Sequence, residues 1–269
     1  MINGTDNIII STFLNLATVG IYTNYLSLTM MTNTLLSSSY KAITASFGNL
    51  IAMENKDLQE QIFQKINFAG HLLYSFVSIA FVILINKFIT LWLGSDYLLP
   101  QVVVIIVCTN FYLDGMKLCL DSIKDASGVY DQDKYIPILQ SIVNIVVSVV
   151  LVQYIGILGV VLGTLISNIL LPCWNRPYII YKYVFDSSPK EYYKNYIKNI
   201  FVCVLISTIM HFVFINIKLK LTLLTFVLYV LLYIVLYVLL ISLIYIKNDN
   251  YHFYVKLFYD RIKSKIKGV

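Results

Sequence analysis

Six long apolar stretches constrain the fold of this chain more than any other feature. Each approaches or exceeds the roughly 20 residues that an α-helix needs to cross the hydrocarbon layer of a bilayer. Because backbone polar groups in lipid must be hydrogen-bonded within their own segment, each stretch is predicted to be a membrane-spanning helix. The stretches are residues 67–93, 100–120, 135–154, 157–180, 200–217 and 221–246.

Two further segments precede these stretches. Residues 21–53 are long enough to span but are much richer in Ser, Thr and Asn, and residues 7–19 are apolar but too short to span. We therefore expect an all-α, polytopic membrane helix bundle over residues 1–246, with about seven full transmembrane helices and one partial helix. Residues 247–269 are expected to form a separate basic tail.

The composition excludes most other classes of protein. Hydrophobic residues make up 59% of the chain and charged residues only 13%, whereas soluble domains carry roughly 25% charged residues. The net charge of +6 comes from basic residues scattered between apolar stretches, which suits a membrane surface and not nucleic acid. The four cysteines have no CxxC spacing, so we predict packing residues and no metal site.

The distribution of basic residues predicts an orientation. If the helices alternate in direction, residues 54–66, 121–134, 176–198 and the tail from Lys247 lie on one side and contain most of the 20 basic residues. The opposite connections contain only Lys87, Lys218 and Lys220. By the positive-inside rule the basic side is cytoplasmic.

The tail has a helical alternation of apolar and basic residues. This pattern predicts an amphipathic helix that lies on the inner leaflet. The apolar positions are Tyr251, Val255, Phe258, Ile262 and Ile266, and the basic positions are Lys256, Lys263 and Lys267.

Within residues 21–53, a stripe of polar or small side chains recurs at spacings of three and four. It comprises Asn24, Ser27, Met31, Thr34, Ser38, Lys41, Ala45 and Gly48. Such a stripe packs on another helix or lines water, and the charge of Lys41 favours a wet cavity because lipid penalises it. Asn24, Thr34, Ser38 and Lys41 are thus candidate substrate-binding residues. The alternative for Lys41 is that its ammonium snorkels to the cytoplasmic interface.

A second charged cluster lies in the stretch that begins at residue 100. Asp114, Lys117 and Asp121 are spaced i, i+3 and i+7, so they share one face of a helix. They are interpreted as a structural charge pair or as part of a coupling or gating site. His71 and His211 are interpreted as packed histidines.

Glycines and prolines predict where helices pack closely or bend. Gly156, Gly159 and Gly163 predict a tight turn followed by a face of small residues that lets two helices approach. Pro137 and Pro172 are expected to kink their helices.

The chain has no sequence motif of an enzyme. It contains no nucleophile motif, Walker loop, HExxH or GxGxxG. The longest connection on the basic side, residues 176–198, is too short for the polar catalytic segment of a glycosyltransferase. We therefore predict neither an enzymatic activity nor a cofactor.

Several segments resemble bacterial polysaccharide flippases, the translocases of O-antigen and capsule repeat units in the multidrug/oligosaccharidyl-lipid/polysaccharide exporter superfamily. The resemblance follows nearly the whole chain in the same order, and its most specific parts are the Asp-Ala-Ser-Gly elbow at 125–128, Asp133-Lys134-Tyr135 and Gly163-Thr164. The segments are TDNIIISTFLNLATVGIYTNYLSL, FGNLIAMENK, KDASGVYDQDKYIPILQSIVNIVVSVVL, GILGVVLGTLISNIL and CWNRPYIIYKYVF.

The resemblance implies two lobes of helices that rock around a central cavity in the bacterial cytoplasmic membrane. It implies translocation of an undecaprenyl-pyrophosphate-linked oligosaccharide, with Lys41 and then Lys117 attracting the pyrophosphate. The chain matches only the second lobe and begins inside that lobe's first helix, so the expected partners are the lipid-linked sugar, membrane lipids and a first lobe. Two alternatives remain: a cation-coupled multidrug exporter of the same superfamily, and a membrane fragment that transports nothing.

Overall fold

The computed structural model of the chain describes residues 2–51, 55–217 and 219–266, and leaves a few side chains within these ranges, including that of Lys41, outside the description. All regular elements in the described ranges are helices. They are α1 (Ile2–Phe13), α2 (Leu16–Ile51), α3 (Lys56–Trp92), η1 (Ser95–Tyr97), α4 (Gln101–Ser127), α5 (Ile136–Ile155), α6 (Ile157–Leu170), α7 (Pro172–Ile180), η2 (Tyr181–Phe185), α8 (Lys190–Ile215), α9 (Leu223–Tyr245) and α10 (Asp249–Ile266).

Six helices in the described part of the chain are long and apolar enough to cross a membrane, and they coincide with the six apolar stretches of the sequence. The fourth of them runs through α6, α7 and η2 as one span, Ile157–Phe185. The more polar α2 has 36 residues, which corresponds to about 54 Å of helix. α1 has 12 residues, too few to cross the layer alone. The described part of the chain is therefore a helical bundle with six helices of membrane-spanning length and composition, and α2, the expected seventh full span, is not among them.

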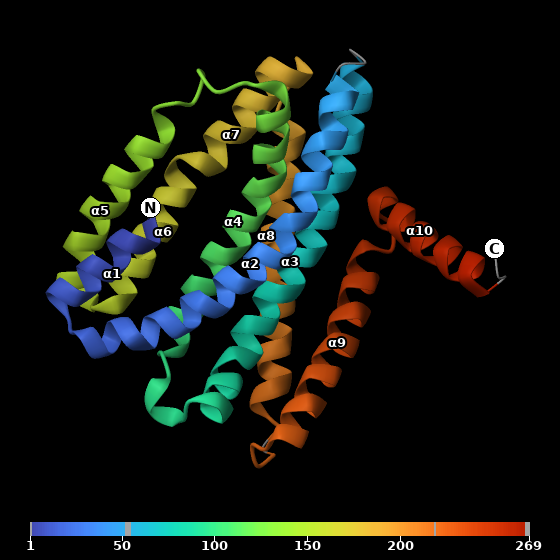
Figure 1. Ribbon diagram of the computed structural model, residues 1–269. Helices are drawn as coiled ribbons and strands as arrows, with labels where there is room; N and C mark the ends of the chain where they lie inside the picture. The colour runs from blue at the N-terminus through green and yellow to red at the C-terminus, as the bar shows by residue number, and fades with distance from the viewer. Residues whose placement is uncertain (1, 52–54, 218, 267–269) are drawn as a thin grey trace.

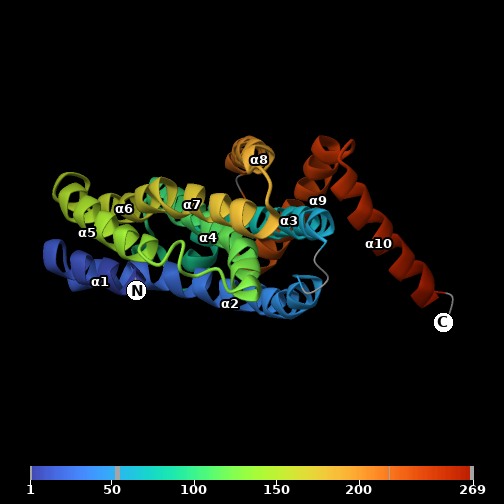
Figure 2. The same cartoon turned by 90° about the horizontal axis from the view of Figure 1, so that it is seen from above.

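The helices are arranged in layers that leave α2 on one face (Figures 1 and 2). Viewed from above, α1 and α2 lie along one side of the bundle, α8 lies on the opposite side, and α3 to α7 fill the space between them. The connections α4–α5 and η2–α8 lie at the top in Figure 1, and the α3–α4 connection, the end of α8 and the start of α9 lie at the bottom. These basic connections are thus opposite the nearly uncharged ones, as the loop charges predict, whereas the α9–α10 junction, where the basic tail begins, lies between the two levels.

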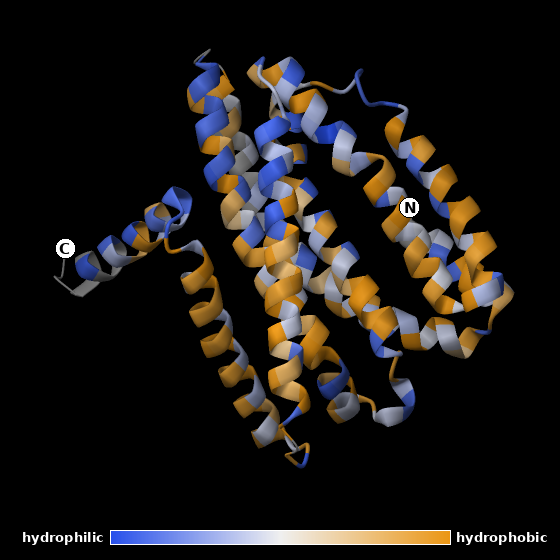
Figure 3. Cartoon of the chain, turned by 180° about the vertical axis from the view of Figure 1, so that it is seen from behind, coloured by the Kyte–Doolittle hydropathy of each residue, from blue (hydrophilic) through white to orange (hydrophobic). Residues whose placement is uncertain are grey.

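α9 divides cleanly into a tyrosine face and an aliphatic face. Tyr229, Tyr233 and Tyr237 are buried against the bundle, and the hydroxyls of Tyr233 and Tyr237 donate to the α3 carbonyls of Phe76 and Leu72. The aliphatic face is exposed, suits contact with lipid, and appears as the nearly uniform hydrophobic ribbon of α9 in Figure 3. It includes Leu231, Val235, Leu239 and Leu243.

The α5–α6 hairpin is as tight as its glycines predict. Gly156 turns the chain with φ of 59°, and a Cβ on Gly159 would lie 2.5 Å from the carbonyl oxygen of Leu151. Pro172 begins α7 where α6 ends, so the expected break is present there. Pro137 instead lies in the first turn of α5, where its missing N–H has no helical partner to lose, so the predicted kink is wrong.

The basic tail forms α10, which leaves the end of α9 at an angle and points away from the bundle (Figure 1). The hydroxyl of Tyr254 donates to the carbonyl of Lys65 on α3 at 3.0 Å. Phe253 and Phe258 are exposed. The helical part of the tail prediction is thus confirmed. Of its expected apolar positions, Val255 and Phe258 are exposed, and the side chains of Ile262 and Ile266 lie outside the described residues.

Candidate functional site

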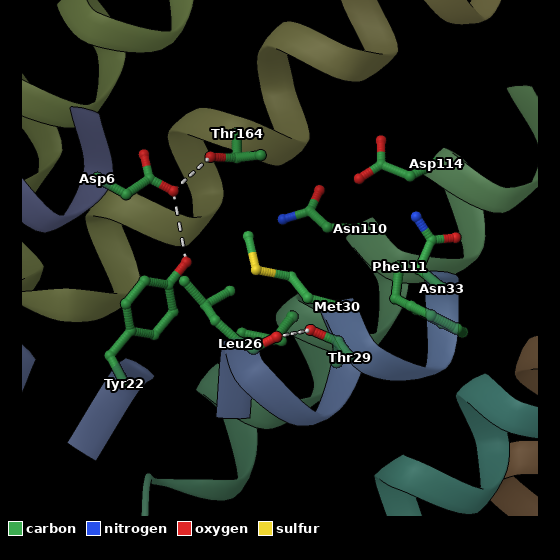
Figure 4. A pocket seen from close by; sticks show the side chains of 11 residues that line it. Asp6, Tyr22, Leu26, Thr29, Met30, Asn33, Asn110, Phe111, Asp114 and Thr164 are labelled. Atoms are coloured by element: carbon green, nitrogen blue, oxygen red, sulfur yellow. Dashed lines mark hydrogen bonds between the residues drawn. The ribbon is translucent and has the colours of Figure 1, made fainter. Parts of the chain in front are cut away.

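A polar pocket lies between α1, α2, α4 and α6, at a depth where the surrounding helices are otherwise apolar (Figure 4). Its volume of about 90 Å³ is enough for several water molecules or a small ion. We call it the Asp6 pocket. It is lined by Asp6, Tyr22, Leu26, Thr29, Met30, Asn33, Val107, Asn110, Phe111, Asp114 and Thr164.

Helical spacing explains why these residues meet. On α2, Tyr22, Leu26, Thr29 and Asn33 follow one another at intervals of three and four, so they form a single face. On α4, the lining residues Asn110 and Asp114 are one turn apart. α1 folds back beside α6 and brings Asp6 to Thr164 (Figure 4).

Asp6 is the most enclosed ionisable group of the pocket, with 1% of its surface exposed. Its Oδ2 accepts hydrogen bonds from the Thr164 hydroxyl at 3.2 Å and the Tyr22 hydroxyl at 3.4 Å. Its Oδ1 is buried and has no hydrogen-bond partner in the described part of the chain. No basic side chain pairs with Asp6 among the described ion pairs. A bare carboxylate in such surroundings is costly.

Asn110 and Asn144 likewise have a buried side-chain oxygen without a hydrogen-bond partner in the described residues. Asn110 Nδ2 donates to the carbonyl of Val161 at 3.1 Å, and Asn144 Nδ2 donates to the Thr164 hydroxyl at 3.0 Å. The Oδ1 atoms of both asparagines are buried without a partner in the described residues. Their amide nitrogens are therefore used within the protein, and acceptor oxygens remain around Asp6.

The pocket thus offers hard oxygen acceptors and lacks an internal donor for them. A proton on Asp6, ordered water or a small monovalent cation would satisfy these atoms. Among the described residues no group of three or more His, Cys, Asp or Glu is placed to hold a metal ion. The arrangement suits reversible binding of a proton or a cation, which changes the charge at one place in the membrane.

The other end of the pocket contains a charge network around Asp114 and Lys117. The Lys117 ammonium lies 2.5 Å from Asp114 Oδ1 and donates to Asn168 Oδ1 at 2.9 Å. Gln140 Nε2 donates to the same Asn168 oxygen at 2.7 Å. Lys117 is buried. Of the two predicted roles, these contacts match the structural pair, while Asp114 also lines the pocket.

Asp121 does not join this network. Its carboxylate pairs with Arg176 on α7, with Nη1 to Oδ2 at 2.5 Å. It is absent from the described lining of the Asp6 pocket. The sequence spacing put Asp121 on the same helical face as Lys117, but one further turn along α4 brings it beside a different helix.

The predicted stripe on α2 is not the face that packs or lines the pocket. Thr34 and Ser38 are exposed, and their hydroxyls donate to carbonyls of their own helix, Met30 and Leu35. Asn24 is half-buried, and the side chain of Lys41 lies outside the described residues. The interior face is rotated by about one residue, which is about 100° in a helix, and includes Asn33. Of the two alternatives for the stripe, packing on another helix is excluded for Thr34 and Ser38 within the described chain, because both side chains are exposed.

The sequence alone did not identify Asp6, Asn110 or Thr164. One signal was available for Asp6, because it is the only acidic residue before position 54 and borders an apolar stretch. Asn110 carried no comparable signal, and Thr164 was named only as part of the resemblance, without a role. Nothing in the order of residues connects positions 6 and 164.

The two intramembrane histidines differ. His71 is fully buried, and its Nδ1 and Nε2 lie 2.9 Å from the hydroxyls of Tyr112 and Tyr245. Because the Tyr245 hydroxyl donates to Asn199 at 2.7 Å, it accepts from Nε2–H, and Nδ1 accepts from Tyr112. His71 is thus a packed, neutral histidine, as predicted. His211 instead lies exposed beside an apolar groove.

Comparison of the chain with protein-family models, curated proteins and solved structures gave no significant match.

Proposed function

We propose that the chain is one lobe of a bacterial flippase that moves an undecaprenyl-pyrophosphate-linked oligosaccharide across the cytoplasmic membrane. The observation that carries the transport part is the Asp6 pocket, where the buried Oδ1 of Asp6 and the Oδ1 of Asn110 have no hydrogen-bond partner in the described residues. Ionisable groups at such depth characterise ion pathways and coupling sites. A purely structural bundle gains nothing from leaving them unpaired.

The exposed face of α2 carries both polar and apolar side chains. Thr34 and Ser38 are exposed beside Met31 and Leu35, and the opposite face packs in the core through Phe47. The two hydroxyls would suit the wall of a water-filled cavity between two lobes. In the sequence Lys41 follows Ser38 at helical spacing, and its charge would attract a pyrophosphate.

In the proposed cycle, the Asp6 pocket supplies the coupling. Loading a proton or a monovalent cation neutralises Asp6, whose Oδ1 is buried without a partner in the described residues. Since Asp6 joins α1 to α2 and α6 through Tyr22 and Thr164, its charge state changes how these helices pack. The lobe would then favour one of its two orientations, and the lipid-linked sugar would cross with its tail in lipid.

Complementation tests this function. The chain joined to a first lobe should restore polysaccharide export to a flippase-deficient bacterium, and Asp6→Asn should abolish the rescue at equal protein level. Failure of the joined protein to rescue export, despite correct insertion, would contradict the flippase assignment.

The acidic pocket gives specific support to a second candidate, a cation-coupled multidrug exporter. That transporter would lower the accumulation of cationic dyes in cells, and a lipid-linked sugar would not compete. Dye efflux without rescue of polysaccharide export would favour this candidate.

A further inference from the structure

A second polar pocket lies beside the junction where α9 turns into α10 (Figure 1). Side chains from α3, η2, α8 and the α9–α10 junction surround a volume of about 60 Å³. We call it the Lys198 pocket. Its polar lining includes Asn67, Asn195, Lys198, Asn199, Asn248 and Asn250. None of these residues lines the Asp6 pocket.

Lys198 gives this pocket an unbalanced positive charge. No carboxylate lines the pocket in the described part of the chain, and no described carboxylate lies within ion-pair distance of Lys198. The ammonium lies 5.8 Å from the centre of the Tyr245 ring. Glu60 is hydrogen-bonded to the lining residue Gln64, and Asp249, exposed between Asn248 and Asn250, does not line the pocket. The net charge of the lining residues themselves is positive, which favours an anion.

The amides around Lys198 supply N–H donors without internal acceptors. Asn199 is 6% exposed, and its Oδ1 accepts from the Tyr245 hydroxyl, so its amide nitrogen is the group left over. Asn248 likewise uses its Oδ1 to accept from the backbone N–H of Tyr251 at 3.1 Å. The side chains of Asn195 and Asn250 make no hydrogen bond within the described residues.

Asn67 completes the set from the α3 side. Its Oδ1 is buried without a partner in the described residues. Rotation of the amide exchanges its oxygen and nitrogen, so this side chain presents either an acceptor or two donors to a ligand. Several amide donors around one ammonium fit a compact anion with several acceptor oxygens.

The level of the Lys198 pocket relative to the membrane indicates which kind of molecule supplies this anion. The apolar helix α9 ends at Tyr245, and the amphipathic α10 begins at Asp249. This change marks the level of the lipid headgroups. Lys198 likewise precedes the apolar stretch 200–217 of α8.

We propose that the Lys198 pocket binds a phosphate group, supplied in the membrane by the phosphodiester of an anionic phospholipid in the leaflet at the basic end. The lipid is a bound partner and not the transported substrate, so the inference goes beyond the proposed transport function. Lys198 provides the charge, and the amides of Asn195, Asn199 and Asn248 provide hydrogen bonds. The bound headgroup would hold the α9–α10 elbow against α3 and α8.

Native mass spectrometry of the purified full chain tests the proposal, with phosphatidylglycerol and a diacylglycerol of the same acyl chains as probes. Phosphatidylglycerol should bind about tenfold more tightly than the diacylglycerol, as expected for a charge-assisted contact. Lys198→Gln should remove most of this preference, and Asn195→Asp should weaken binding by repulsion. Lys194→Gln is the matched control, because Lys194 is exposed one turn earlier on α8 and does not line the pocket.

Competition with inorganic phosphate identifies the source. Displacement of the lipid by phosphate in the wild type, and not in Lys198→Gln, supports one shared phosphate site. Binding of inorganic phosphate with no binding of phosphatidylglycerol would assign the site to free phosphate. The proposal is overturned if neither binds, if the diacylglycerol binds as well as phosphatidylglycerol, or if Lys194→Gln and Lys198→Gln have equal effects.

Discussion

The Asp6 carboxylate accepts a 3.2 Å hydrogen bond from the hydroxyl of Thr164, which lies 158 residues later in the chain. The contact joins α1 to α6, and Thr164 also accepts from Asn144 on α5. The Asp6 carboxylate on α1 is therefore linked to α6 and α5 through the Thr164 hydroxyl. Any change in the charge of Asp6 acts on the packing of this part of the bundle.

Replacement of Asp6 by Asn should weaken ion binding while preserving the fold. The amide keeps the shape of the side chain and removes the buried charge, so thermal stability should be unchanged or higher. Hydrogen bonds to charged groups contribute about 1.5–3 kcal/mol, so cation affinity should fall roughly ten- to hundredfold. Isothermal titration with Na⁺ and stopped-flow measurement of proton release would detect the two ligands. Asp96→Asn, at an exposed position, is the control, and an equal loss there would exclude a specific role for Asp6.

Replacement of Lys41 should separate charge from structure in the full transporter. A Lys ammonium in a low-dielectric cavity attracts a pyrophosphate more strongly than the same group in water. Lys41→Ala should therefore reduce transport of the lipid-linked sugar, while Lys41→Arg, which retains the charge, should keep more activity. Complementation normalised to membrane protein level measures both. Normal transport by a well-expressed Lys41→Ala protein would show that the charge is not in the substrate path.

The orientation can be tested by cysteine accessibility. Ser95, in the α3–α4 connection, and Lys247, in the α9–α10 junction, are exposed, and the positive-inside rule places Lys247 in the cytoplasm and Ser95 outside. A membrane-impermeant maleimide applied to intact cells should label Ser95→Cys and leave Lys247→Cys unmodified until the cells are opened. The parent protein controls for Cys203, since Cys108, Cys119 and Cys173 are buried. The reverse labelling pattern would invert the topology.

The α5–α6 hairpin should not tolerate a side chain at Gly159. A Cβ there would approach the Leu151 carbonyl oxygen to 2.5 Å, and backbone cannot rotate away as a side chain can. Gly159→Ala should destabilise the protein by about 1–3 kcal/mol, as overpacking generally does, and lower its melting temperature in detergent. Gly20→Ala is the matched control, because Gly20 is helical and a Cβ added to it would have no neighbouring atom within 4 Å. Its higher helix propensity should leave Gly20→Ala neutral or stabilised by up to about 1 kcal/mol.

The sequence by itself determined the membrane class, the six spans, their separation into basic and nearly uncharged ends, and the helical tail. These properties depend on segment length, hydropathy and loop charge, which are local. It also predicted the tight α5–α6 turn, because Gly156 and Gly159 act on neighbours close in the chain. The sequence also identified Lys117 as a charged residue within an apolar stretch, but it left both Asp114 and Asp121 as partners for it.

Only the tertiary structure decided which of the two acids pairs with Lys117. Asp114 pairs with Lys117, whereas Asp121 reaches Arg176 on α7. Helical spacing alone could not choose between neighbouring stripes of α2. The packing of the helices decided that Asn33, and not Thr34, lines the pocket. The Asp6 site required α1, α4 and α6 to converge. Such contacts depend on how whole helices pack, and a pattern read along one helix contains no information about the side chains that a distant helix brings beside it.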